Sequence, residues 1–195
     1  RYDEAIVELD EFCERYPQEP EALEARYLLA KAMQKSARQF QERLRTAETE
    51  NTRAESRRRL KERLEQAMNN FQKVQKELQT RQAASQLDPM GRTILRNCSF
   101  DVAQTLFSLG RYDDAIAAYS KAVGRLQQHP EALLAYVQIA NCYDRLKKPA
   151  EALSTLVQAK ILLEQIPEKD FPLGESRMSK PEWQKWLDWA MKLHN

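Results

Sequence analysis

The side chains that could perform chemistry are few in this sequence, and they lie far apart. Its 195 residues contain three cysteines, Cys13, Cys98 and Cys142, and two histidines, His129 and His194. No cysteine has a histidine within several residues, so no local base would deprotonate a thiol for nucleophilic attack. Three widely spaced cysteines do not form a disulfide framework, and two histidines offer little for a zinc site. We therefore expect no enzyme activity, no metal and no cofactor.

The composition excludes further classes of protein. There are 31 Lys and Arg against 29 Asp and Glu, and this net charge of +2 does not demand a nucleic-acid partner. Four glycines are too few for most sheet-and-turn architectures or for a glycine-rich phosphate cradle. No apolar run approaches the roughly 18 residues that would cross a membrane. The chain begins at Arg1 with neither Met nor a signal peptide, so we expect a piece of a longer protein. Its compartment, periplasmic, cell-envelope or cytoplasmic, stays open.

The elements that position the surface residues are indicated by an internal repeat. The segment Arg1-Tyr-Asp-Glu-Ala-Ile6 is matched by Arg111-Tyr-Asp-Asp-Ala-Ile116. After each key alanine a bulky residue follows four positions later, and an apolar residue three beyond that. The four copies are Ala5/Leu9/Phe12, Ala67/Phe71/Val74, Ala115/Tyr119/Ala122 and Ala152/Leu156/Ala159. Such spacing places a small residue between bulky ones on one helix stripe, which predicts paired helices that stack.

The clearest copies resemble the tetratricopeptide repeat (TPR) family. The resemblance rests on Gly110-Arg-Tyr-Asp-Asp-Ala-Ile-Ala-Ala-Tyr119 and on a second set: Tyr136, Ile139, Ala140, Tyr143, Ala152, Leu156 and Ala159. It covers roughly residues 1–165 and implies an all-α solenoid of antiparallel helix pairs. Phe12-Cys-Glu-Arg-Tyr-Pro17, followed by Glu21–Tyr27, is similar to bacterial cell-envelope TPR proteins. Ser99 and Arg26 depart from the family, because they stand where it prefers an aromatic residue.

The distance between repeats predicts one elongated hairpin. From Ala5 to Ala67 is 62 residues, which is 28 more than the 34-residue period of the family. Heptad stripes follow on both sides: Met33, Ala37, Phe40, Leu44 and Ala47, then Leu60, Leu64, Ala67, Phe71, Val74 and Leu78. They predict an antiparallel coiled-coil-like hairpin over about 21–86, with a tip near 49–52 and a capping box at Thr52–Glu55. One unbroken helix through 21–86 is the alternative.

The chain is therefore expected to form a repeat domain at 1–165, a loop at 166–180 and a C-terminal capping helix at 181–195. The next helix after the hairpin should begin at Asp88-Pro89, with Asp88 as N-cap. Ser179 should cap the last helix. Its Trp183 and Trp186 would cover the last repeat, and Trp189 would stay partly exposed.

The resemblance to TPR proteins also implies a concave groove lined by the first helix of each pair, where partners usually bind. The residues expected there are Tyr27, Leu28, Lys31, Phe100, Asp101, Gln104, Phe107, Val137, Gln138, Asn141 and Asp144. Mixed aromatic and polar faces suit recognition of a peptide segment. The alternative is that these side chains pack against neighbouring helices. We expect a non-catalytic protein-binding scaffold whose partner is another protein or a peptide segment.

A basic prong is the second candidate site. Residues 35–63 hold ten Lys and Arg against five Asp and Glu, and Arg57, Arg58 and Arg59 form the densest cluster. Such a cluster could meet acidic protein, phosphate or lipid. It could equally be a solvated helix exterior in which Glu55 pairs with Arg59. Aromatic residues for nucleic-acid stacking are missing around it. Two alternative functions follow: self-association through the 36–63 hairpin, or regulation within a larger protein.

Overall fold

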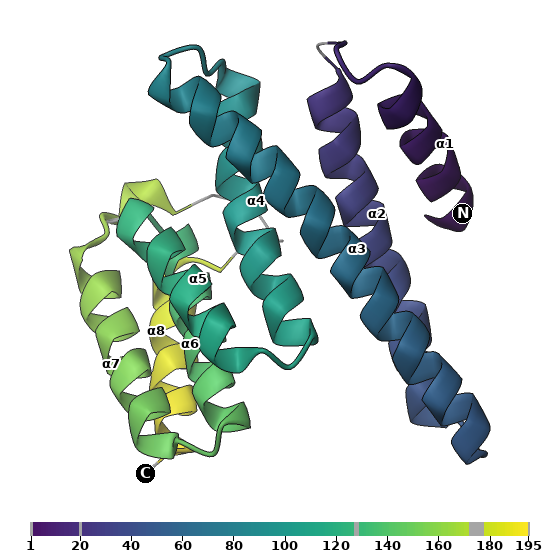
Figure 1. Cartoon of the computed structure of the whole chain (residues 1–195). Helices are drawn as coiled ribbons and strands as arrows, with labels where there is room; N and C mark the ends of the chain where they lie inside the picture. Colours follow the sequence, from purple (N-terminus) through teal and green to yellow (C-terminus); the bar gives the residue numbers. More distant parts are fainter. Residues whose placement is uncertain (1, 20, 127–128, 172–177, 195) are drawn as a thin grey trace. The chain divides into compact units, whose positions relative to one another are not determined.

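The structure, a computed structural model, describes residues 2–19, 21–126, 129–171 and 178–194. Over these ranges it is all-α, with eight α-helices, one 3-10 helix and no strand. Consecutive helices pack as antiparallel pairs (Figure 1), which confirms the expected fold class. Contacts divide the chain into two compact units, Arg1–Gly110 and Arg111–Asn195, and each is described by itself.

The first unit is built around two long helices. It contains α1 (Tyr2–Arg15), α2 (Ala22–Thr46), α3 (Glu50–Ala83) and α4 (Pro89–Ser108). In Figure 1, α2 and α3 lie side by side and run to a shared tip beyond the ends of α1 and α4. The backbone is extended at Ala47 and at Thr49, so the alternative of one unbroken helix is wrong.

The heptad stripes form the seam of this hairpin, as the sequence predicts. Met33 and Ala37 are buried on α2, and the stripe of α3 is buried from Leu64 to Leu78. Phe40 and Leu44 are only half-buried toward the tip. Burying apolar side chains stabilises the pair by about 1.5–3 kcal/mol for each large residue. The hairpin therefore draws most of its packing energy from its base.

The cap of α3 differs from the prediction. Thr49, not Thr52, is the N-cap, and its hydroxyl accepts a hydrogen bond from the Thr52 amide at 3.2 Å. The helix thereby starts three residues earlier than the expected capping box, because a second threonine offers the same acceptor one turn before. Glu55 is also unavailable as a reciprocal cap, since its carboxylate pairs with arginines in the next turn. Asp88 caps α4 and Pro89 occupies its first turn, as predicted.

The second unit holds α5 (Tyr112–Arg125), α6 (Glu131–Arg145), α7 (Pro149–Gln165), a 3-10 helix (Glu168–Asp170) and α8 (Lys180–Lys192). Ser179 and Glu182 form a capping box at the start of α8, in agreement with the expected Ser179 cap. Part of the loop expected at 166–180 falls on 172–177, which lie outside the described residues.

The core of the second unit joins α6, α7 and α8. Trp183 and Leu187 of α8 are buried with Leu133 of α6 and Leu156 of α7. Trp186 packs against this core, whereas Trp189 is 57% exposed. The burial expected for the three tryptophans is therefore confirmed.

The key alanines of the repeat occupy the contacts that the sequence predicts, with one exception. Ala67, Ala115 and Ala152 are fully buried, so their methyl groups lie where helices approach one another. Ala5 is only half-buried, and the buried positions of α1 are Ile6 and Cys13. The stripe is displaced there because α1 packs chiefly against α2.

Candidate functional site

In the first unit, the expected groove residues of α2 meet α4 at Asp101. The Tyr27 hydroxyl donates a hydrogen bond to Asp101 Oδ2 at 2.9 Å, and Lys31 Nζ donates to Oδ1 at 2.9 Å. Gln34 Nε2 adds bonds to the Asp101 carbonyl at 3.2 Å and to the Thr105 hydroxyl at 2.9 Å. The Asp101 carboxylate is 13% exposed, so these contacts are worth more than a surface ion pair. Together they fix α2 beside α4.

Tyr27 is also held by the hairpin. Its ring lies 6.0 Å from the ring of Phe71 on α3, at a tilt of 55°. Burial of the phenol, with the neighbouring Asp101 carboxylate, raises the pKa of Tyr27 far above its ordinary value. Tyr27 and Lys31, both predicted as groove residues, are therefore engaged between helices, and the residue that unites them is Asp101.

Three of the remaining candidates of the first unit lie along one side of α4. Phe100, Gln104 and Phe107 recur at spacings of four and three, and all three are half-buried. On α2, Leu28 is 47% exposed. Half-buried aromatic rings beside an amide make a face that can bind an apolar side chain and a peptide backbone together.

The four candidates of α6, Val137, Gln138, Asn141 and Asp144, have different surroundings within the second unit. Val137 packs against the core shared with α8, as in the alternative interpretation. Asp144 Oδ1 lies 3.5 Å from His194 Nδ1 just after α8. Asn141 is exposed and makes a long 3.4 Å hydrogen bond to Gln138. Of the predicted α6 face, Asn141 and Asp144 are thus the exposed residues.

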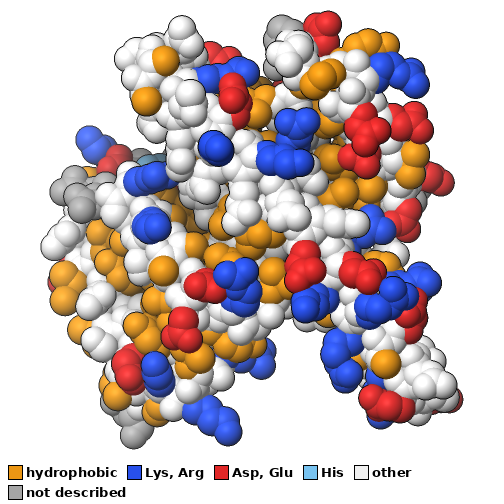
Figure 2. All heavy atoms as spheres, in the orientation of Figure 1, with side chains coloured by type: hydrophobic (Ala, Val, Ile, Leu, Met, Phe, Trp, Pro, Cys, Tyr) orange, Lys and Arg blue, Asp and Glu red, His pale blue; other side chains and the backbone are white. Residues whose placement is uncertain are grey.

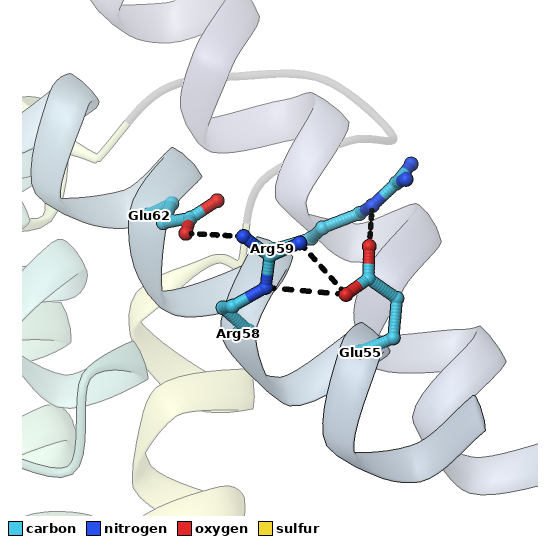
Figure 3. Close-up of polar contacts among 4 residues, drawn as sticks. All are labelled: Glu55, Arg58, Arg59 and Glu62. Atoms are coloured by element: carbon cyan, nitrogen blue, oxygen red, sulfur yellow. Dashed lines mark hydrogen bonds and ion pairs between the residues drawn. The ribbon is translucent and has the colours of Figure 1, made fainter. Parts of the chain in front are cut away.

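The arginine cluster of the hairpin is largely neutralised by its own helix. Arg58 pairs with Glu55 at 2.8 Å and with Glu62 at 3.2 Å, and Arg59 also pairs with Glu55, as Figure 3 shows. Figure 2 shows acidic and basic side chains intermixed along the hairpin of α2 and α3. The two arginines hold the pKa of Glu55 below its ordinary value. Arg57 is exposed. Because Arg58 and Arg59 are paired with glutamates, the cluster presents less positive charge than three arginines suggest.

A cavity that sequence reasoning missed lies between α5, α6 and α7. Its volume is about 430 Å³, within the range of small ligand pockets. Tyr136 and Tyr143 contribute from α6, Gly124 from α5 and Glu151 from α7. Two signals could have found it: a glycine inside a helix, and two tyrosines seven residues apart on one face.

The cysteines are core residues. All three are buried, and Cys98 donates a hydrogen bond to the Phe71 carbonyl at 3.2 Å. Burial raises the pKa of Cys98 to about 12 and that of Cys142 to about 11. A thiol with such a pKa is protonated at neutral pH and is a poor nucleophile.

Among the residues that the structure describes, no group of three or more His, Cys, Asp or Glu side chains could hold a metal ion. In the same ranges, none of the helices combines the length and the apolar character that spanning a membrane would require.

Comparison with known proteins gives a match to a family model and likenesses to solved structures. A family model described as "Tetratricopeptide repeat" matches residues 94–162. No curated protein matches the chain. A crystal structure of nearly identical TPR-like repeats, ascribed to a kinesin light chain of Podosopora anserina, shares 16% identity. That likeness covers 84% of this chain and 87% of the other, with a TM-score of 0.40, and at this level it carries no inference.

The family match falls on the copies that carry the resemblance most clearly. It extends from α4 to α7 and includes the buried Ala115 and Ala152. Neither comparison supports the finer likeness to bacterial cell-envelope proteins. TPR domains are generally modules for contacts between proteins. Residues 94–162 of this all-α chain are therefore similar to the tetratricopeptide repeats.

Proposed function

We propose that the chain is a non-catalytic scaffold that binds a segment of another protein on the first-helix faces of its repeats. The observation that carries the proposal is the bracing of α2 to α4 through Asp101, beside the half-buried Phe100, Gln104 and Phe107. A face fixed before binding loses little conformational entropy when a partner docks, which favours affinity. The three-point bracing gives this face that rigidity.

The chemistry of the face suits an apolar peptide segment. Burying an aromatic anchor contributes roughly 1.5–3 kcal/mol, so Phe100 and Phe107 together could hold a segment at about micromolar affinity. Gln104 lies between them on α4 and adds a polar amide group to this face. In the second unit the exposed Asn141 offers the same polar group on α6.

The test compares the proteins that the wild type and two double variants capture. Replacing Phe100 and Phe107 with Ala should remove captured proteins, as quantified by mass spectrometry, while the helical circular dichroism is retained. The matched control replaces Val7 and Met90, two exposed apolar residues of the same unit, and should change nothing. Equal capture by both double variants and the wild type would count against this face.

A second readout keeps the test independent of folding defects. A photo-crosslinking amino acid at Ser108, exposed at the end of α4, should crosslink to the partner more than one at Glu11, exposed on α1. Crosslinking that favours Glu11 would place the partner elsewhere. Together the two readouts distinguish a lost binding face from a destabilised unit.

Self-association through the hairpin is the second candidate function. One observation favours it: Phe40, Leu44 and Leu60 are only half-buried toward the tip, although they belong to an apolar seam. A second copy could cover such residues. Deleting residues 36–63 should then lower the mass measured by light scattering to that of one chain. A wild type that is already monomeric would reject this candidate.

A further inference from the structure

The cavity between α5, α6 and α7 is lined by aromatic and aliphatic side chains and by polar ones, among them Ser120, Ser154, Thr155 and Gln158. Tyr136 and Tyr143 are both half-buried, and they stand seven residues apart on the same face of α6. Ile116 and Val123 of α5 line the opposite part and are also half-buried. A side chain that enters would therefore meet two phenol rings, three branched aliphatic groups and several neutral polar groups.

The cavity carries a single charge of negative sign. Glu151 is the only charged residue among those that line it, and its side chain is exposed. Within the described part of the chain, no Lys, Arg or His forms an ion pair with it. Because no cation lines the cavity, a phosphate or carboxylate would be repelled there. A cation that reached Glu151 would gain a charge-assisted contact.

Gly124 leaves room at the rim. It is the next-to-last residue of α5. A Cβ atom added there would meet nothing within 4 Å. The missing side chain therefore keeps open a space that a larger residue could fill without strain on its neighbours.

We propose that this cavity binds a basic side chain, arginine or lysine, of a partner protein. The aliphatic stem would lie along Ile116 and Val123, the cation would face Tyr136 and Tyr143, and Glu151 would pair with it. The volume of about 430 Å³ accommodates one long side chain, and the exposed Glu151 and Gly124 allow entry from solvent. The site goes beyond the proposed function, because none of its residues belongs to the faces argued above.

The experiment titrates the labelled full chain with Nα-acetyl-arginine amide and follows its amide resonances by NMR. Single side chains bind weakly, so the titration extends to about 50 mM. Saturable shifts should be confined to residues around the cavity. Nα-acetyl-norleucine amide tests the aliphatic stem without the cation, and Nα-acetyl-glutamate amide tests the opposite charge. Both should produce at most a third of the occupancy that the arginine probe reaches.

Two variants with matched controls assign the site. Gly124→Leu should abolish the shifts by filling the space, whereas Ala117→Leu, exposed on the same helix and outside the cavity, should leave them intact. Glu151→Gln should weaken binding about threefold, and Glu164→Gln, exposed further along α7, should not. Thermal unfolding shows that each variant is folded.

Several outcomes would overturn the proposal. These are the absence of saturable shifts, equal binding of norleucine and arginine probes, or retention of binding in Gly124→Leu. None of these would affect the scaffold proposal, whose test uses Phe100 and Phe107. Conversely, unchanged capture by that double variant would leave the cavity result standing.

Discussion

Asp101 is the residue at which three side chains of α2 converge, and Tyr27 is one of them. Replacing Tyr27 with Phe removes only the hydroxyl that donates to Asp101 at 2.9 Å. We expect the free energy of unfolding to fall by about 1 kcal/mol at pH 7, the usual net value of such a bond. Urea denaturation measures it. In an Asp101→Ala background the same change should cost less, because the acceptor is already gone. Equal costs in both backgrounds would remove the hydroxyl from this network.

The contribution of Tyr27 should also depend on pH. Its pKa is raised from an ordinary value of 10.0 by burial and by Asp101, so above about pH 10 the unfolded chain loses this proton while the folded chain keeps it. Stability falls with rising pH wherever the unfolded state binds fewer protons. The advantage of wild type over Tyr27→Phe should therefore be complete below pH 10 and shrink above it. A difference that grows in that range would contradict the assignment.

The cysteines give a prediction about accessibility. Burial raises the pKa of Cys98 to about 12 and of Cys142 to about 11, so both thiols should resist a disulfide reagent at pH 8. The native chain should react far more slowly than the chain in urea, where three thiols should be titrated. Replacing Cys98 with Ala should leave the native rate unchanged. Rapid modification of Cys98 in the native chain would show that the base of the hairpin opens.

At the scale of elements, the structure and the sequence prediction differ in the residue that caps the start of α3. Thr49→Ala removes the N-cap acceptor and should cost about 1 kcal/mol, within the usual range for such caps. Thr52→Ala leaves the backbone amide that donates to Thr49 in place and removes only the hydroxyl contact between the two threonines. It should therefore lower the free energy of unfolding by only a few tenths of a kcal/mol. Chemical denaturation compares the two, and hydrogen exchange of residues 50–53 localises the effect. A larger cost for Thr52→Ala would restore the cap expected from sequence.

Periodicity predicted the elements well because it reports burial within one helix. The stripes from Met33 and from Leu64 identified the hairpin, and the small residues Ala67 and Ala115 identified close helix contacts. Local chemistry predicted the caps Asp88 and Ser179 for the same reason, since a cap acts within one turn. The error at Thr52 arose because two threonines three residues apart satisfy the same local rule.

The candidate site was predicted less completely because it depends on contacts between distant segments. The resemblance to TPR proteins placed Tyr27, Lys31 and Asp101 on one face, but it could not show that these side chains, 70 or more residues apart, bond to one another. Val137 was expected on an open face, and it packs against a core completed by Trp183 and Leu187 from α8. Amphipathic patterning distinguishes the apolar side of a helix from its polar side, but it does not identify the neighbouring helix that covers the apolar side.

At the scale of the whole molecule, two compact units share one repeat pattern. The family match at 94–162 begins in α4 of the first unit and ends in α7 of the second. Repeat proteins gain stability from each repeat and from its interfaces with neighbours, so units can unfold together or separately. The single repeat domain expected over 1–165 stays a prediction that unfolding experiments can decide.

All three tryptophans lie in α8, so tryptophan fluorescence reports on the second unit, whereas far-ultraviolet circular dichroism reports on the helices of both. If the two compact units unfold separately, the two signals should give transitions that do not coincide. Leu187→Ala, at a fully buried position of α8, should cost about 2–5 kcal/mol and shift the fluorescence transition. Phe71→Ala, equally buried in α3, should shift only the dichroism. Coincident transitions that both variants displace together would instead establish one cooperative repeat array, because each unit would then be stabilised by the folding of the other.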